Sequence, residues 1–278
     1  MVVDYNSVSP GDSPASFVEY DANSILVLVE NASGKRIDLV RKDGSALSTY
    51  LLNSSALTGI MRKLLRLPDG SLLVSKSTAI EKFSPTKARV TVASMPYVNS
   101  PGGSCANSAS LITGLATWPD GKILFTHAAS SPNNKIGVIS ASGYSSTADC
   151  VATQAPPTSL ALPTSPLMHS SGKLLVAYAS TTPSANTIHA YDVNASINSI
   201  SNATVAYTDP VIVFGPTAIA EDTATGAVFV ANGGSSFNSI EKFSFNSSTR
   251  LLTRTSSTPF IGPQVYTRCV TDMKVMDE

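Results

Sequence analysis

The hydrophobic residues of this chain recur in short runs along its whole length, and each run follows a short polar turn. The runs are rich in Val, Ile and Leu and are bounded by Gly, Pro, Asp and Ser. Such short, turn-bounded runs predict β-strands, whereas a helix needs a longer segment with a period near 3.6 residues. Residues 57–67 have a helix-like pattern, but the turn that follows and their place in the repeat predict an inner strand. The five runs occupy residues 24–29, 71–75, 122–126, 173–178 and 227–231.

The turns before these runs recur at intervals of about 50 residues, and this repetition is the main signal in the sequence. Repeats two and five also share the segment Ile-Glu-Lys-Phe-Ser, at residues 80–84 and 240–244. Two charged residues separate Ile from Phe there, so this segment predicts a β-bulge. The turns end at Asn23, Gly70, Gly121, Gly172 and Gly226.

Each repeat has room for about four short strands, which is the content of one β-propeller blade. A four-stranded sheet cannot cover both of its apolar faces alone, whereas blades stacked round an axis bury both. We therefore predict an all-β chain, a single domain over residues 1–278, in which four-stranded antiparallel blades form a β-propeller. Five blades are predicted, with a closing strand at 267–277 that pairs with the first repeat; six blades, or a fragment of a longer propeller, remain alternatives. The repeats lie near residues 15–55, 56–109, 110–157, 158–213 and 214–266.

Repeat five resembles the YVTN/lactonase-like propeller repeat through residues 215–220, 223–232 and 238–244. The Pro-Asp-Gly turns of repeats two and three are similar to the same broad group, which includes NHL and gluconolactonase-type repeats. The resemblance implies the propeller architecture, but enzymes and binding scaffolds share this repeat. In the family's lactone-hydrolysing enzymes a polar cluster lies at the mouth of the central channel, in some with a metal held by acidic and Asn side chains. No such set is evident here, so the resemblance assigns no catalytic residue, no metal ligand and no cofactor.

The composition is poor in charge. Charged residues make up 14% of the chain, against an average of about 25%, and Ser, Thr and Asn replace them. The 19 basic and 19 acidic residues give no net charge, which argues against nucleic acid as a partner. Arg62, Lys63 and Arg66 lie close together in the sequence, and we interpret them as solvated strand ends.

No apolar run approaches the length of about 18 residues that would predict a membrane span. Residues 1–14 contain no apolar segment typical of a signal peptide, which leaves a cytosolic protein or one whose leader has been removed. The low charge and the abundance of hydroxyl groups favour the second interpretation. We therefore expect an extracellular, cell-surface or periplasmic location.

Two of the three cysteines are a candidate disulfide. Cys105 and Cys150 each lie in a loop just before a repeat begins, so they are expected at the same edge of the ring. Two free thiols remain the alternative. Cys269 lies in an apolar strand and is predicted to be a small buried residue.

The start of each innermost strand should supply the side chains that face the central channel. Asp272 is the one charged residue among these positions and is a candidate ligand contact, although one carboxylate makes neither an acid–base pair nor a site for a hard cation. A channel packed with small side chains and water is the alternative. His127, His169 and His189 occupy different phases of the repeat, so no zinc site is predicted. The channel positions are Thr58-Gly59, Thr113-Gly114, Thr158-Ser159, Thr217-Ala218 and Thr271-Asp272.

Aromatic residues in or near the long loops are the other candidate ligand contacts. Tyr97, Trp118 and Phe237 lie beside Asn, Ser, Gly and Pro, and loops on a rigid scaffold commonly carry binding sites. Such rings can stack on a sugar or anchor a protein partner. The alternative is that they cap the core.

These observations favour a non-enzymatic, exported propeller that recognises a protein or a glycan at the cell surface. Two alternatives remain open. One is a lactonase-like hydrolase with its site at the central channel, and the other is a structural module of a longer surface protein. A polar cluster in the channel would favour the enzyme, and an exposed aromatic patch on one loop face would favour binding.

Overall fold

The computed structural model describes most of the strands and short turns of the chain. The described residues are 13–31, 34–45, 47–51, 57, 60–77, 79–92, 95–96, 98–99, 111–128, 134–140, 150–154, 161–233, 238–262 and 272–275.

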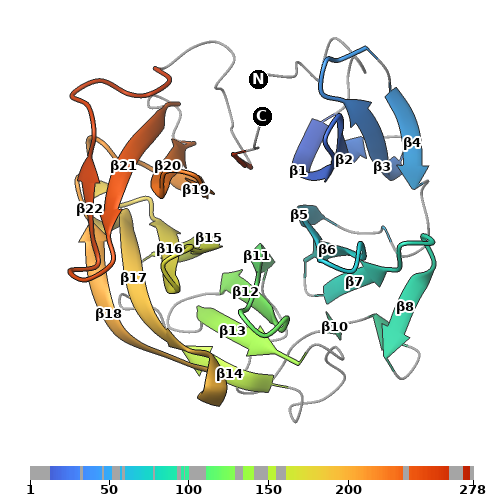
Figure 1. Ribbon diagram of the computed structural model, residues 1–278, viewed down its shortest axis with the longest axis horizontal. Coiled ribbons are helices and arrows are strands. Elements are labelled where there is room, and N and C mark those ends of the chain that lie inside the picture. Colours follow the sequence, from blue (N-terminus) through green and yellow to red (C-terminus); the bar gives the residue numbers. More distant parts are fainter. Residues whose placement is uncertain are drawn as a thin grey trace.

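Five antiparallel sheets are arranged round a central axis (Figure 1). Blade 1 contains β1 (Ser13–Asp21), β2 (Ser24–Asn31), β3 (Gly34–Arg41) and β4 (Leu47–Leu51). Blade 2 contains β5 (Met61–Arg66), β6 (Leu72–Lys76), β7 (Ala79–Phe83) and β8 (Arg89–Val92), with the short β9 (Met95–Pro96) and β10 (Val98–Asn99) at its edge. Blade 3 contains β11 (Leu111–Thr117), β12 (Ile123–Ala128), β13 (Lys135–Ile139) and β14 (Cys150–Gln154).

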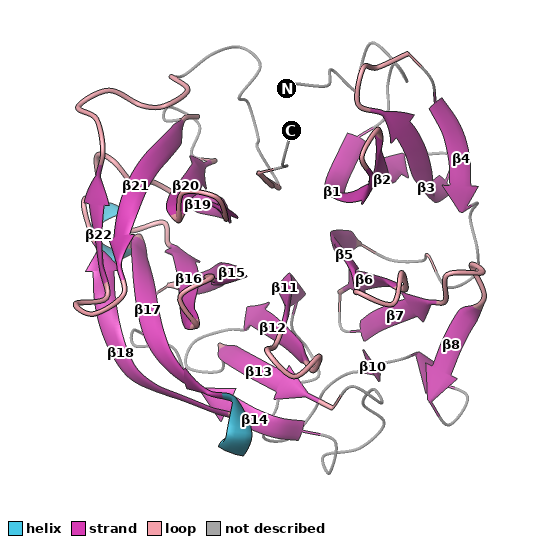
Figure 2. Ribbon diagram, in the orientation of Figure 1, coloured by secondary structure: helices cyan, strands magenta, loops and turns pink. Residues whose placement is uncertain are grey.

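Blade 4 contains β15 (Leu162–Met168), β16 (Lys173–Ala179), β17 (Thr187–Asn194) and β18 (Ser199–Tyr207). Blade 5 contains β19 (Pro216–Asp222), β20 (Ala227–Asn232), β21 (Ile240–Asn246) and β22 (Leu251–Arg254). Two single-turn 3-10 helices, η2 (Pro183–Ala185) and η3 (Ala195–Ile197), are the helical elements of the described chain (Figure 2). The predicted fold class, an all-β propeller of five four-stranded antiparallel blades, is confirmed.

The repeated turn owes its sequence to backbone geometry. Gly70, Gly121 and Gly172 have φ values of 82°, 82° and 78°, in the left-handed region that favours glycine. Each glycine N–H donates to the carbonyl three residues earlier, at 2.8–2.9 Å. In the Pro-Asp-Gly turns the carboxylates of Asp69 and Asp120 also accept backbone N–H groups, at 2.8 and 3.2 Å. These Asp residues therefore stabilise turns.

The described core lies between neighbouring blades, where it joins blade 1 to 2, 2 to 3, 3 to 4 and 4 to 5, and it uses both faces of the sheets of blades 2, 3 and 4. On β7, Ile80 packs with Ile112 and Ile123 of blade 3, whereas Phe83 packs with Val18 of blade 1. Pairing between β6 and β7 is continuous, and so is the pairing of the matching segment of β21. The predicted bulge in Ile-Glu-Lys-Phe is therefore wrong. The two apolar residues face opposite ways because each face of the sheet is covered by a different blade.

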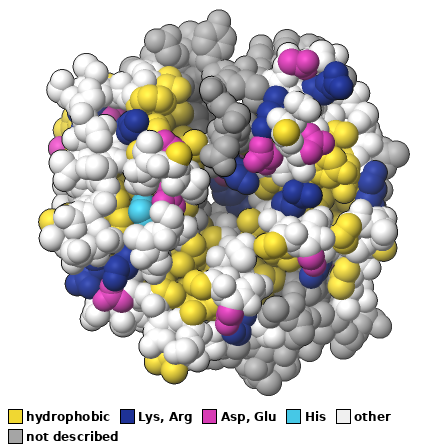
Figure 3. Space-filling model, in the orientation of Figure 1, with side chains coloured by type: hydrophobic (Ala, Val, Ile, Leu, Met, Phe, Trp, Pro, Cys, Tyr) yellow, Lys and Arg dark blue, Asp and Glu magenta, His cyan; other side chains and the backbone are white. Residues whose placement is uncertain are grey.

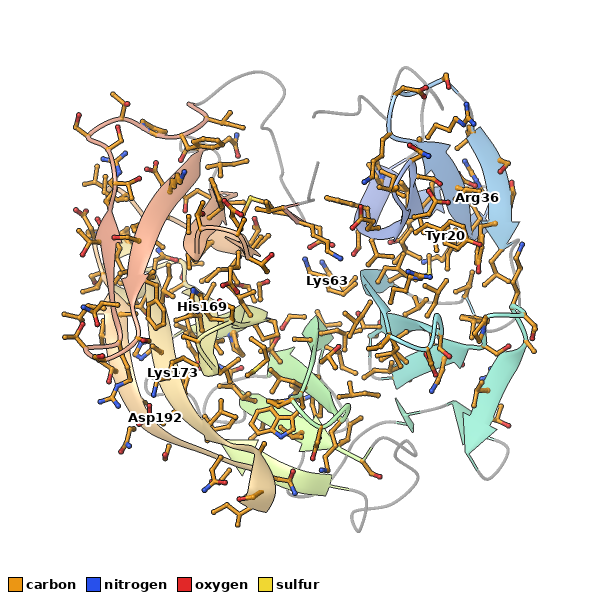
Figure 4. All side chains as sticks on the ribbon, viewed as in Figure 1. Tyr20, Arg36, Lys63, His169, Lys173 and Asp192 are labelled. Atoms are coloured by element: carbon orange, nitrogen blue, oxygen red, sulfur yellow. The ribbon has the colours of Figure 1, made fainter. Side chains whose placement is uncertain are left out.

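Ion pairs support the outer part of the ring. The carboxylate of Asp192 lies 2.7 Å from Lys173 Nζ and 2.7 Å from Arg250 Nη1 (Figure 4), and it accepts a hydrogen bond from Asn202 Nδ2 at 2.7 Å. Lys173, then Asn202 and Arg250, lower the pKa of Asp192 to about 2. Because Arg250 follows β21, this cluster links blades 4 and 5.

The inner strands form the wall of the channel, in the order β1, β5, β11, β15 and β19. Of the closing strand predicted at 267–277, the structure describes residues 272–275, which have no strand pairing. Figure 1 shows this short segment, in dark red, near the axis between blades 5 and 1. Its Asp272 contacts Ser16 and Lys63, so the segment is connected to blades 1 and 2 through a side chain.

Candidate functional site

A cavity of about 580 Å³ lies at one end of the central channel. This volume falls in the range of about 300–1,000 Å³ that is typical of ligand pockets. The inner strand of every blade contributes to its wall, and Figure 3 shows Lys and Arg side chains gathered at the central hollow. The lining residues are Pro14, Ala15, Glu30, Ile60, Met61, Arg62, Lys63, Thr113, Thr164 and Thr217.

A β-bulge explains why these positions line the cavity. Each inner strand has one extra residue relative to its partner strand, near the end where the cavity lies. A bulge changes the direction in which a side chain points, and here the bulged residues border the channel. The bulge therefore places equivalent residues of every blade at the cavity wall. These bulge residues are Ala15 in blade 1, the pair Arg62 and Lys63 in blade 2, Thr113 in blade 3, Thr164 in blade 4 and Thr217 in blade 5.

The threonines also connect blades. Thr113 Oγ1 donates to the carbonyl of Pro163 at 2.6 Å, and Thr164 Oγ1 donates to the carbonyl of Pro216 at 2.8 Å. Each bond runs from one inner strand to the next. Since a hydroxyl has one proton and two lone pairs, these oxygens can still accept hydrogen bonds from a bound molecule. The wall thus presents fixed acceptor atoms.

Lys63 is the buried charge of the cavity. The residue is 8% exposed, and its Nζ lies 2.8 Å from Asp272 Oδ1. Figure 4 shows its side chain directed into the channel from β5. The interpretation of Lys63 as a solvated strand end is therefore wrong, because the bulge turns it inward, where it has an acidic partner. Arg62 and Arg66 are exposed, as that interpretation expected.

Asp272 completes this ion pair. Its Oδ1 accepts from Lys63 Nζ and from the backbone N–H of Met273, at 3.0 Å. Its Oδ2 accepts from the Ser16 hydroxyl and, at 3.4 Å, from the backbone N–H of Phe17. The carboxylate is therefore held by donors from blades 1 and 2. A ligand contact at Asp272 stays a prediction.

The structure places Trp118 away from any ligand surface. Its side chain is fully buried in a cluster with Leu124 of blade 3 and Leu174 and Val176 of blade 4. The prediction that this ring contacts a ligand directly is therefore wrong, and the alternative, that it is a core side chain, fits the structure. Its position just before a turn, equivalent to the buried Leu67, was a signal in the repeat that would have indicated this.

Several candidate residues lie outside the described part of the chain and stay predictions. The side chain of Cys150 is also not described, although the residue belongs to β14, and the disulfide with Cys105 stays a prediction. Among the predicted channel positions, Thr113 and Thr217 do line the cavity. Thr164 was missed, although it follows Thr113 by one repeat. The candidates outside the described residues are Tyr97, Phe237, Cys105, Cys269, Thr58-Gly59, Thr158-Ser159 and Thr271.

The three histidines lie in separate surroundings. His169 Nε2 is 3.3 Å from a carboxylate oxygen of Glu221, whereas His189 packs against the edge of Tyr178 with ring centroids 5.2 Å apart. Burial lowers the pKa of His189 to about 4. Within the described ranges, no group of three His, Cys, Asp or Glu residues is arranged to hold a metal ion. Nor does any helix among the described residues have the length and apolar character needed to cross a membrane.

Comparisons with known proteins support the fold. The sequence matches no protein-family profile and no curated protein. Solved structures do match. Virginiamycin B lyase from Staphylococcus aureus has a TM-score of 0.57 at 16% identity, covering 89% of this chain and 71% of the lyase chain. A gluconolactonase from Xanthomonas campestris has a TM-score of 0.54 at 14% identity, covering 82% and 71%.

A chain in the nidogen/laminin complex has a TM-score of 0.58 at 13% identity, covering 89% of this chain and 80% of that one. The resemblance to lactonase-like propeller repeats is thus confirmed at the level of architecture. At such identities the likeness shows the fold alone, which lyases, lactonases and binding domains share.

Proposed function

We propose that this propeller is a binding protein and that its central cavity holds a small polar ligand, such as the terminal sugar of a glycan. The observation that carries the proposal is the shared bulge position, which brings one side chain from every blade to a cavity of ligand size. Threonine oxygens on three blades can accept hydrogen bonds from sugar hydroxyls, and Ile60 offers a small apolar surface. A rigid wall with a few fixed polar atoms is typical of such sites.

The wider biological setting is part of the same proposal. The hydroxyl-rich, weakly charged composition supports a protein that works outside the cytosol. A similar propeller takes part in the nidogen/laminin complex, which supports recognition of a macromolecule, and we place that recognition at the cell surface. Binding of the terminal sugar of such a molecule would combine both features.

Thr164→Val tests the proposal at its centre. Valine keeps the β-branched shape but removes the oxygen, so one hydrogen bond to a ligand hydroxyl is lost. We expect about tenfold weaker sugar binding, since one hydrogen bond contributes about 1–1.5 kcal/mol. Glycan-array screening would supply the ligand, and isothermal titration calorimetry would measure the dissociation constant.

Thr253→Val is the matched control, because Thr253 is exposed on the outer strand β22. Thermal unfolding of each variant shows whether the lost bond to Pro216 has damaged the fold. The proposal fails if no glycan or monosaccharide binds the folded protein, or if Thr164→Val binds as tightly as the wild type. Hydrolysis of an aldonolactone by the wild type, lost in Thr164→Val, would instead favour the lactonase-like alternative.

A further inference from the structure

A carboxylate of the chain itself is already bound to Lys63, one of the residues that line the cavity. Asp272 accepts hydrogen bonds from Lys63 Nζ, from the Ser16 hydroxyl and from the Phe17 N–H. These donors belong to blades 1 and 2, whereas Asp272 follows Lys63 by 209 residues. The arrangement is the one that a ligand carboxylate would need.

We propose that Lys63, Ser16 and the Phe17 N–H form a carboxylate-recognition site, and that Asp272 occupies it as an internal competitor of an acidic ligand. The inference rests on the proposed function, since it names the ligand class of the same cavity. It assigns an acidic sugar or hydroxy acid as the ligand. Binding of that ligand displaces Asp272.

The donors are held in place before any ligand binds. Ser16 is 2% exposed, and its Oγ accepts the backbone N–H of Leu64 at 2.9 Å. Its own proton is therefore directed to the carboxylate. The backbone N–H of Lys63 donates to Ser75 Oγ at 2.9 Å, which fixes the base of the lysine side chain. Preorganised donors of this kind favour binding because little order is lost.

The competitor is attached more loosely than the donors. Residues 272–275 have no strand pairing, and within the described part of the chain Asp272 is bound to blades 1 and 2 through its side chain. Departure of this side chain therefore breaks no strand pairing of residues 272–275. A ligand carboxylate can take its place at Lys63 while the ligand hydroxyls reach the oxygens of Thr113, Thr164 and Thr217.

Among the described residues that line the cavity, Lys63 is the buried cation whereas Arg62 is exposed to solvent, so the buried part of the site offers one cation to a ligand carboxylate. Glu30 also lines the cavity, and a second negative group on the ligand would meet it. Glu30 forms an ion pair with Lys35 at its own site. We therefore expect a monocarboxylate with several hydroxyl groups, of which glucuronate is a suitable probe.

Asp272→Asn is the decisive variant, measured by calorimetry with glucuronate and with neutral glucose. If Asp272 occupies the site for about nine-tenths of the time, its removal strengthens glucuronate binding about tenfold and leaves glucose binding unchanged. Lys63→Met should remove the preference for glucuronate over glucose. Asp69→Asn is the matched control, because this exposed carboxylate lies in the turn of blade 2 and its loss should change neither constant.

Methionine methyl NMR gives a second readout that does not depend on a sugar. Met273 adjoins Asp272, so its methyl signal should move when acetate is added to the wild type but not to Lys63→Met. The inference is overturned if acetate leaves this signal unchanged, or if Asp272→Asn binds glucuronate no more tightly or strengthens both sugars equally. If neither sugar binds any folded variant while acetate does move the signal, the sugar-binding proposal fails and the carboxylate site stands.

Discussion

His189 should make the stability of the protein depend on pH in the weakly acid range. The residue is 2% exposed, and its Nδ1 has no hydrogen-bond partner within the described part of the chain. Burial lowers its pKa to about 4, from 6.5 in an unfolded chain. Between these two values the unfolded chain binds a proton that the folded chain does not bind. Stability is therefore complete above the unfolded pKa and falls as the pH drops toward 4.

The size of the effect follows from the shift. Each pKa unit corresponds to about 1.4 kcal/mol, and most of the interval has been crossed by about pH 5. We expect the wild type to lose about 2 kcal/mol of unfolding free energy from His189 between about pH 7.5 and pH 5.

Urea denaturation of the wild type and of His189→Phe, at a series of pH values, measures this contribution. Phenylalanine keeps a planar ring in contact with Tyr178 but cannot bind a proton. Packing differences shift the two stability curves by a constant, whereas the histidine contributes only to the difference in slope. Parallel curves for the two proteins between about pH 7.5 and pH 5 would refute the reasoning.

Two further predictions concern packing and charge in the blades. Gly137→Ala should destabilise the protein by about 1–3 kcal/mol in urea denaturation, because the added Cβ would lie 2.3 Å from the Phe125 ring. Gly262→Ala is the control and should be near neutral, because its added Cβ meets no atom within 4 Å. Equal losses of unfolding free energy in the two variants would contradict this account. Asp192→Asn should lower the unfolding temperature at neutral pH, and the gap to the wild type should close as the pH falls from about 4 toward 2, since the lowered pKa of Asp192 gives stability that is lost in that range. A gap that persists at the lowest pH would show that the ion pairs with Lys173 and Arg250 are not its cause.

The fold could be predicted because its signals are local and repeated. The repeated turn can be recognised from four consecutive residues, because a glycine follows a polar residue in it. This glycine has a positive φ in the structure and recurs at Gly70, Gly121 and Gly172. Counting the repeated turns, including the one that ends at Asn23, favoured five blades over the alternative of six. The bulge expected in Ile80-Glu81-Lys82-Phe83 failed because the pattern was interpreted as having one buried face, whereas the sheet has two.

The cavity was harder to predict because it depends on contacts between distant residues. Whether Lys63 lies in water or in the channel is decided by the register of β5 on β6 and by Asp272, 209 residues later. No short pattern contains that information. Thr164 is different, since its place in the repeat relative to Thr113 and Thr217 was available in the sequence.

The bulge in each inner strand places the residues that would contact a ligand apart from the apolar residues on the sheet faces that form the core. Core residues on the sheet faces hold the blades together, whereas the bulged residues of the inner strands line the cavity. Natural variation at the bulges can therefore change what the cavity accepts, and it affects the contacts between blades at Thr113 and Thr164, whose hydroxyls bond the next inner strand. Among the described residues that line the cavity, both cations belong to blade 2, so moving the Arg-Lys pair to Thr164-Ser165 would move the binding position of an acid to blade 4, two blades further round the axis. The ring is thus a scaffold in which the identity of the ligand and its orientation can evolve separately.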